Sequence, residues 1–220
     1  MELYSNPRKM NPVMPDDSAL EEKAVELVKK SSKLGESIHP VTRKQVRDLV
    51  RPLNSHYSNR IEGHDTHLKD IQEALEQNYS EEPSQKKKQK LALAHILVQE
   101  TMEKRLADGE IDSVTSPSFI RWIHREFYKN IPESMRWVEG EDRRKEVIPG
   151  EIRSQDDEIV GARDHFGVDP TSVSSFLDRF HDVYDPSEMD TIQTLKAFGA
   201  SHHRLLWIHP FLDGNGRITR

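Results

Sequence analysis

The chain contains 220 residues, of which 34% are hydrophobic and 32% are charged, and its formal net charge is −6. It is long enough to bury a core, and its acidic balance argues against a general nucleic-acid-binding protein. The absence of cysteine excludes disulfides and cysteine-ligated zinc. Because no apolar run approaches the roughly 20 residues of a membrane span and no signal peptide is visible, we expect a cytoplasmic protein that contacts neither membrane nor nucleic acid.

The first segment, residues 1–15, carries Pro7, Pro12 and Pro15, which oppose regular structure, so a loose tail is expected there. After it, apolar residues recur at helical spacing, with capping residues ahead of several of the runs. Helices are predicted to begin at or near Ser18, Thr42, Thr66, Ser84, Ser116 and Asp169, and a last one carries Ile192 to Leu206. Ser116 and Asp169 are each followed by a proline, which suits the first helical position.

The stretch between Trp137 and Gly161 departs from the helical pattern, because it is charged and interrupted by glycines and a proline. Within it, residues 148–153 and 158–160 are predicted to pair as two short strands. We therefore expect an all-α fold, a helical bundle with a short β-hairpin. The chain is divided here into an N-terminal helical region, residues 1–110, and a core, residues 111–220.

The last twelve residues, His209–Arg220, hold groups suited to a polyphosphate. Gly214 and Gly216 lack a Cβ, so the backbone there can turn sharply and present N–H groups to an anion at close range. Asn215 can donate its side-chain amide to a phosphate oxygen. Arg217 and Arg220 lie three residues apart, so a helix places both guanidinium groups on one face, where they suit a polyphosphate.

Two further side chains complete this segment. Asp213 offers the hard oxygen ligand that Mg²⁺ prefers. His209 ends the preceding helix and can take a proton from an incoming hydroxyl. A base, a metal ligand, an anion cradle and a charge clamp therefore fall within one short segment, which predicts phosphoryl or nucleotidyl transfer.

This segment resembles the signature of the Fic (filamentation induced by cAMP) family, His-x-Phe-x-Asp/Glu-Gly-Asn-Gly-Arg-x-x-Arg, at all eight constrained positions. The resemblance implies a Fic-type helical bundle and a protein adenylyltransferase, which moves AMP from ATP to a Ser, Thr or Tyr hydroxyl of a target protein. It implies that His209 is the general base, that Phe211 anchors the turn in the core, and that Asp213 holds Mg²⁺. The implied nucleotide-binding residues are Gly214, Asn215, Gly216, Arg217 and Arg220, with Arg220 at the γ-phosphate.

By the same resemblance, the predicted hairpin is the family's flap, which pairs with a target segment by strand addition. Its target-binding residues would be Ile152, Arg153, Ile159 and Val160. The resemblance also implies a core that is incomplete at its C-terminus, because family members continue past the position of Arg220. Relatives often dimerise, which leaves a homodimer open, and His124 is expected to be a core histidine on the first core helix.

An upstream segment, residues 58–63, matches the family's inhibitory motif, Ser/Thr-x-x-x-Glu-Gly/Asn, through Ser58, Glu62 and Gly63. The pattern is short, but the sequence contains it once. We expect Glu62 to pair with Arg220 and to occupy the γ-phosphate position, so that the enzyme is autoinhibited.

Other functions remain open at this level. The same pocket could transfer a phosphoryl group from an inverted ATP, although an intact Gly-Asn-Gly-Arg-x-x-Arg turn favours AMP transfer. Glu62 could instead orient water for removal of AMP from a modified target. A non-catalytic nucleotide-binding regulatory module is less favoured, because His209 and Asp213 are both present. A toxin with a separate antitoxin is also less favoured, since the inhibitory motif lies within the chain.

Overall fold

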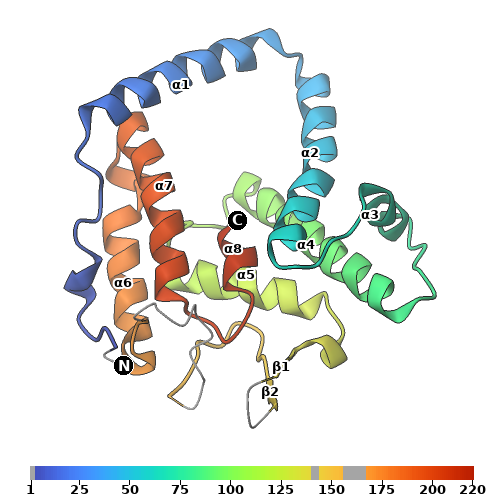
Figure 1. Cartoon of the computed structure of the whole chain (residues 1–220). Helices are drawn as coiled ribbons and strands as arrows, with labels where there is room; N and C mark the ends of the chain where they lie inside the picture. The colour runs from blue at the N-terminus through green and yellow to red at the C-terminus, as the bar shows by residue number, and fades with distance from the viewer. Residues whose placement is uncertain (1–2, 140–143, 156–166) are drawn as a thin grey trace.

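The computed structural model describes residues 3–139, 144–155 and 167–220, and it confirms the expected helical bundle with a small hairpin (Figure 1). The helices are α1 (Ser18–Ser37), α2 (Pro40–Ile61), α3 (Leu68–Leu75), α4 (Pro83–Ala107), α5 (Pro117–Lys129), α6 (Val173–Tyr184), α7 (Thr191–Ile208) and α8 (Asn215–Thr219). The two strands are β1 (Trp137–Glu139) and β2 (Arg144–Glu146), and they pair antiparallel. Short 3₁₀ helices, among them Pro7–Met10 and Pro170–Ser172, lie between these elements.

Side-chain caps explain where several helices begin. The carboxylate of Asp17 accepts from the N–H of Ala19, which starts α1. Ser116 caps α5 through the N–H of Phe119. At α7, Asp190 and Gln193 form a reciprocal capping box. The predicted start at Asp169 opens a 3₁₀ turn, and α6 follows directly at Val173.

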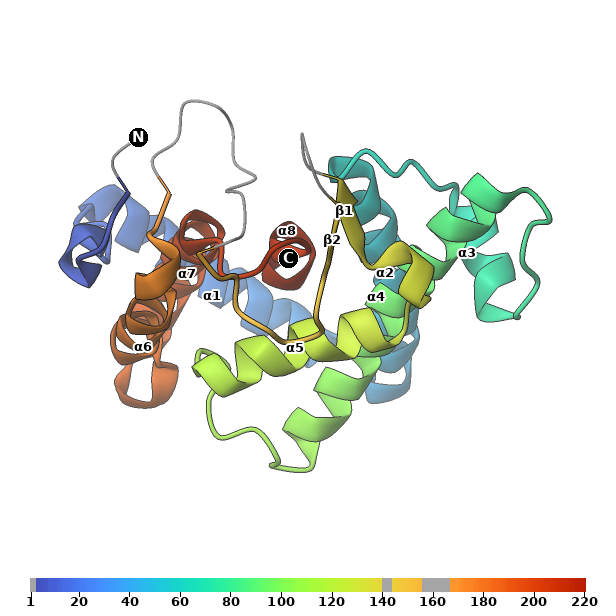
Figure 2. The ribbon, with the colours of Figure 1, turned by 90° about the horizontal axis from the view of Figure 1, so that it is seen from below.

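The helices form two groups that meet at α8. One group pairs α6 with α7 around an apolar core that includes Phe176, Phe180 and Phe211. The other packs α2, α3 and α5 against α4. Helix α1 crosses from the upper end of α7 to the upper end of α2 (Figure 1), and α8 lies between the two groups when the molecule is seen from below (Figure 2). The last element of the chain is therefore placed against both groups.

The N-terminal segment is ordered, in contrast to the loose tail expected from its prolines. Asn6 caps the 3₁₀ turn that Pro7 begins, and this turn ends in Met10, which is fully buried in the core of α6 and α7. The backbone of Tyr4 pairs with residues 167–169. The prolines fail to prevent this packing because Pro7 occupies the first helical position, where its missing N–H costs nothing.

The hairpin lies earlier in the chain than predicted. Its strands place Trp137 opposite Glu146 and Glu139 opposite Arg144, and the Arg144 guanidinium lies 4.6 Å from the centre of the Trp137 ring. The predicted first strand, residues 148–153, is a turn and irregular backbone within the described part of the chain. The predicted second strand, residues 158–160, lies outside the described residues.

Apolar side chains that recur at helical spacing within residues 18–53 are largely exposed. Leu27 is 55% exposed, Leu34 60% and Leu49 67%, on α1 and the first half of α2. The helices expected from this periodicity are present, and their apolar faces are largely exposed. Within residues 3–139, 144–155 and 167–220, no helix combines the length and apolar character that crossing a bilayer demands.

Candidate active site

The predicted site is a tight turn between α7 and α8. Helix α7 ends at Ile208, and His209 adopts the left-handed conformation with φ 50° and ψ 61°. Phe211 is fully buried, and its ring stacks on His124 of α5 at 3.9 Å between ring centres. The Asn215 amide closes the turn, because its oxygen accepts from the N–H of Phe211 at 2.9 Å and its nitrogen donates to the Phe211 carbonyl at 2.8 Å.

This bracing role differs from the role predicted for Asn215. The sequence suggests an amide that meets a phosphate oxygen, but the side chain is buried and both of its polar ends are bonded to the backbone of Phe211. The physical reason is the sharp turn itself, whose inward-facing N–H and C=O groups require partners once they are buried. Asn215 therefore fixes the shape of the cradle.

Two side chains of helix α5, His124 and Tyr128, form hydrogen bonds with Asp213. The Nδ1 atom of His124 accepts from the N–H of Gly150 at 2.8 Å, so Nε2 carries the proton and donates to the Asp213 carbonyl at 3.2 Å. Burial lowers the pKa of His124 to about 4, which keeps this ring neutral at pH 7. The Tyr128 hydroxyl donates to Oδ2 of Asp213 at 2.7 Å. His124 is thus a buried histidine, as expected, and it also orients the turn.

Tyr128 is a site residue that sequence reasoning missed. It is almost fully buried, and burial together with the Asp213 charge raises its pKa well above the ordinary value. Its spacing from His124 offered a signal, since residues four apart share one face of a helix. The neutral phenol therefore acts as a fixed donor to Asp213.

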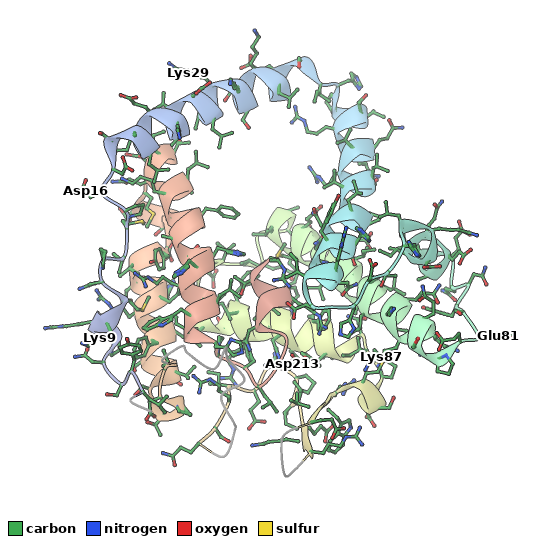
Figure 3. All side chains as sticks on the ribbon, viewed as in Figure 1. Lys9, Asp16, Lys29, Glu81, Lys87 and Asp213 are labelled. Carbon is green, nitrogen blue, oxygen red and sulfur yellow. The ribbon has the colours of Figure 1, made fainter. Side chains whose placement is uncertain are left out.

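Asp213 presents a half-exposed carboxylate near the end of α8 that faces α5 (Figure 3). Among the described residues, no group of three or more His, Asp or Glu side chains could hold a metal ion. A single carboxylate suits Mg²⁺ that arrives with a nucleotide, because this ion keeps several waters and is commonly held by one or two carboxylates plus substrate phosphates. The donor set therefore fits a magnesium–nucleotide complex.

Two arginines on α8 supply positive charge beside this carboxylate. Arg217 is buried, and its Nε has no hydrogen-bond partner among the described residues. One of its Nη atoms lies 3.9 Å from Oδ2 of Asp213. The Nε of Arg220 donates to the Ser58 hydroxyl at 3.3 Å. A buried guanidinium with an unused donor is suited to an anion that enters the site.

The glycines of the turn are required by their surroundings. Gly214 has φ 81°, and a Cβ at this position would lie 2.9 Å from the Tyr128 ring. A Cβ on Gly216 would collide with the Glu62 carboxylate and lie 3.0 Å from a nitrogen of Arg220. The backbone of the turn is therefore approached closely by Tyr128 on one side and by Glu62 and Arg220 on the other.

Glu62 reaches this position from the end of α2. Gly63 has φ 77° and ends the helix. Its N–H donates to the Arg60 carbonyl, and the N–H of His64 donates to the Asn59 carbonyl. Glu62 is consequently the last residue before the reversal, and its carboxylate forms an ion pair with Arg220. The structure brings the three predicted inhibitory residues, Ser58, Glu62 and Gly63, to one end of α2 against α8.

His209 is partly buried at the end of α7. Burial lowers its pKa, and the neighbouring charge of Arg153 lowers it further. The imidazole is therefore neutral at pH 7, the form that can accept a proton.

The described residues of the predicted flap lie beside the motif. Ile152 is half-buried and packs against the core of α6 and α7. The side chain of Arg153 is buried and donates to the His209 and Val168 carbonyls. The carbonyls at the end of α7 attract this guanidinium, since they have no donors within the helix. The main-chain pairing with a target that is predicted for Arg153 stays a prediction. Ile159 and Val160 lie outside the described residues.

Comparison with known proteins identifies a family domain in the C-terminal part of the chain. Residues 114–220 match a family model described as the Fic/DOC family, and this span contains the motif turn, α5 and Arg153. Residues 114–220 are therefore identified as a Fic/DOC-family domain. Helix α2 and its Glu62 precede the matched span, so the contact between Glu62 and Arg220 joins the Fic domain to a segment outside it.

Relatives with assigned names match shorter stretches. The chain is 31% identical over 61 residues to "Protein adenylyltransferase Fic" of Nematostella vectensis and 30% identical over 71 residues to the protein of that name from Drosophila erecta. These stretches cover 28% and 32% of this chain, and 14% of each relative's length. A crystal structure of a Fic domain containing signaling protein from Bacteroides thetaiotaomicron superposes with a TM-score of 0.64 at 20% identity, over 89% of this chain and 69% of that one. At this identity, the superposition shows a shared fold.

Proposed function

We propose that this Fic protein transfers AMP from ATP to a Ser, Thr or Tyr hydroxyl of a target protein, and that Glu62 restrains the reaction. The observation that carries the proposal is the convergence of Glu62 and Arg220 on Gly216, in a turn that also holds His209 and Asp213. The names of the relatives from Nematostella vectensis and Drosophila erecta support the same activity.

Nucleotide binding would use the groups that the turn leaves available. Arg217 offers a buried guanidinium with an unused Nε donor to the phosphates. Arg220 would bind the γ-phosphate after it leaves Glu62, since a guanidinium pairs with carboxylate and phosphate in the same geometry. Asp213, oriented by Tyr128, would hold Mg²⁺. When bound, this ion would neutralise charge on the phosphates during transfer.

The chemistry then depends mainly on position. The hydroxyl oxygen of the target forms a bond to the α-phosphorus, the bond from that phosphorus to the bridging oxygen of the β-phosphate breaks, and pyrophosphate leaves with both electrons of that bond. His209 accepts the proton of the hydroxyl, as a neutral imidazole can. The cradle formed by Gly214, Asn215 and Gly216 lowers the barrier by holding the phosphates in line.

Target recognition would use the segment that contains Ile152, with Ile159 and Val160, by pairing main chain with main chain. Ile152 lies beside the motif, since Arg153 next to it donates its N–H to the Pro210 carbonyl at 2.9 Å. A target strand bound there would bring its hydroxyl close to His209. The identity of the target does not follow from pairing of this kind.

Autoinhibition follows from competition for one guanidinium. The Glu62 carboxylate is paired with Arg220, and on this proposal a γ-phosphate would need the same guanidinium. A triphosphate must displace this carboxylate or bind with its α-phosphate away from His209. Either outcome lowers the rate of transfer in the wild-type protein.

The test is incubation of the Glu62→Gly protein with Mg²⁺ and ATP labelled at either the α- or the γ-phosphate, in a cell lysate and with the protein alone. AMP transfer predicts incorporation of the α label without the γ label, at a rate above that of wild type. Glu76→Gly is the matched control, because Glu76 is the C-terminal cap of α3 as Glu62 is of α2. It should behave as wild type.

Adding His209→Ala to Glu62→Gly should abolish incorporation. Incorporation of the γ label instead would identify a phosphotransferase. Absence of both labels from the Glu62→Gly protein and its targets would reject the proposed activity.

A further inference from the structure

Arg153 makes an unusual set of contacts with the end of α7. Its Nε donates to the His209 carbonyl at 2.7 Å, and one Nη lies 3.4 Å from the Ile208 carbonyl and within hydrogen-bond distance of the Val168 carbonyl. Its own backbone N–H donates to the Pro210 carbonyl at 2.9 Å. The residue is only 4% exposed. A single arginine thus contacts three consecutive residues around the proposed base.

The local backbone shows why this position needs a cation with several donors. The last carbonyls of a helix have no partners within the helix, and the helix dipole adds negative potential there. His209 is also in the left-handed conformation, which glycine usually adopts at a helix end. A planar guanidinium can satisfy several carbonyls at fixed angles, which the single ammonium of a lysine cannot reproduce.

The third acceptor links this contact to the N-terminal segment. Val168 lies between Gly167, whose carbonyl accepts from the Tyr4 N–H at 2.9 Å, and Asp169, whose N–H donates to the Tyr4 carbonyl at 2.8 Å. The Val168 carbonyl is therefore held in place by a parallel pairing with Tyr4. The guanidinium of Arg153 therefore connects the Val168 carbonyl, which this pairing holds in place, with the carbonyl of His209.

We propose that Arg153 is a positioning residue for the transfer reaction, whose guanidinium holds His209 in the left-handed conformation that presents its imidazole to the site. The kinetic part of this inference rests on the proposed function. Arg153 lies outside the set Asp213, Arg217 and Arg220 that would contact the nucleotide. Its loss should therefore slow transfer without weakening the binding of ATP.

The experiment compares Arg153→Lys with Arg121→Lys, both in the Glu62→Gly protein. Arg121 is the matched control, since its Nε also donates to a backbone carbonyl, that of Gly150, but does not reach His209. Arg153→Lys should lower kcat by about 100-fold while the KM for ATP changes less than about twofold, because a small misplacement of a catalytic group is enough for such a loss. Arg121→Lys should leave both constants near the parent values.

Two measurements independent of turnover accompany the kinetics. In the histidine NMR spectrum, the ring signals of His209, identified by their absence in His209→Ala, should shift in Arg153→Lys and stay in place in Arg121→Lys. In the parent protein, the Nε–H of Arg153 should exchange with solvent much more slowly than that of free arginine. This second measurement needs no variant and holds even where Arg153→Lys does not fold.

Several results would overturn the inference. The first is an Arg153→Lys protein with parental kcat and unshifted His209 signals. The second is an Arg153→Lys protein that loses ATP affinity in parallel with kcat. The third is rapid exchange of the Arg153 Nε–H in the parent protein. If the parent itself transfers no AMP, the proposed function fails, and the NMR measurements still decide whether Arg153 positions His209.

Discussion

The carboxylate of Glu62 binds the guanidinium of Arg220, joining the end of α2 to the end of α8 across 158 positions of sequence. Both groups lie directly against Gly216. The site that would hold the end of a triphosphate is consequently shared by an acid from outside the Fic domain and an arginine from within it.

Gly216→Ala should weaken nucleotide binding. In the Glu62→Gly protein the new methyl group would still lie 3.0–3.1 Å from both terminal nitrogens of Arg220 and would push this guanidinium from its place. We expect the affinity for ATP–Mg²⁺, measured by calorimetry, to fall about tenfold, which corresponds to the loss of one charge-assisted hydrogen bond.

The matched control for Gly216→Ala is Gly199→Ala on α7. Apart from the adjacent residues and the backbone of the helix itself, no described atom there lies within 4 Å of the added Cβ. This variant should bind ATP like its parent and be more stable by roughly 0.5–1 kcal/mol, because alanine is favoured over glycine inside a helix. Equal ATP affinities for Gly216→Ala and its parent would show that the turn does not approach the phosphates.

Tyr128→Phe should raise the Mg²⁺ concentration needed for half-maximal transfer by the Glu62→Gly protein. The substitution removes the hydroxyl that donates to Asp213 at 2.7 Å and leaves the carboxylate free to rotate. We expect a change of about 10-fold from the loss of a hydrogen bond to a charged group. Tyr184→Phe is the control, since its hydroxyl donates to the Val13 carbonyl away from the site. Identical magnesium curves for the two variants would exclude a role for Tyr128.

Acid should destabilise the fold through two buried histidines, His95 of α4 and His124 of α5. Burial lowers the pKa of each from 6.5 to about 4, and the charges of Arg220 and Arg217 contribute at His95. Between these values the unfolded chain binds protons that the folded protein does not. The stabilisation is therefore complete above pH 6.5 and falls as the pH drops toward 4, by up to about 1.4 kcal/mol per pH unit for each histidine.

Urea unfolding across this pH range measures the effect. His95→Gln should remove the contribution of His95 to the slope of unfolding free energy against pH, and the contribution of His124 should remain. His67→Gln, at an exposed position, is the control variant. A slope that is the same for wild type and His95→Gln would contradict the assignment.

Met10→Ala tests the packing of the N-terminal segment. Met10 is fully buried among residues of α6 and α7, so truncation should lower the free energy of unfolding by about 2–5 kcal/mol. Lys9→Ala, at the adjacent exposed position, should change it by less than about 0.5 kcal/mol. Equal stability of the two variants would mean that the segment is not part of the core.

Local signals in the sequence were sufficient for most helices and for the motif. Asp190 and Ser116 are polar caps whose effect depends on their immediate neighbours, and the motif turn is specified by glycines whose constraint is also local. The same reasoning applied to Asn6-Pro7 would have predicted the ordered N-terminal turn, because a capping residue followed by proline is the pattern that begins α5.

The hairpin and the roles of two polar side chains depended on partners far along the chain. The hairpin is held by a cation–π contact between Arg144 and Trp137 and by an ion pair between Arg144 and Glu139, in strands that lack the usual alternation of apolar residues. The sequence places Asn215 in the phosphate cradle and Arg153 in the target-binding flap, and neither position reveals which carbonyls its side chain meets. Burial turned both side chains toward the backbone of the motif.

The most direct measurement is calorimetric titration of ATP with Mg²⁺ into the wild-type, Glu62→Gly and Glu76→Gly proteins. Removal of the Glu62 carboxylate should free Arg220 and strengthen binding by about 10-fold or more, since a charge-assisted contact no longer competes with the phosphate. Glu76→Gly should match wild type. If the Glu62→Gly protein takes up no ATP–Mg²⁺, or binds it no more tightly than wild type, the triphosphate does not occupy the place that Glu62 holds beside Arg220.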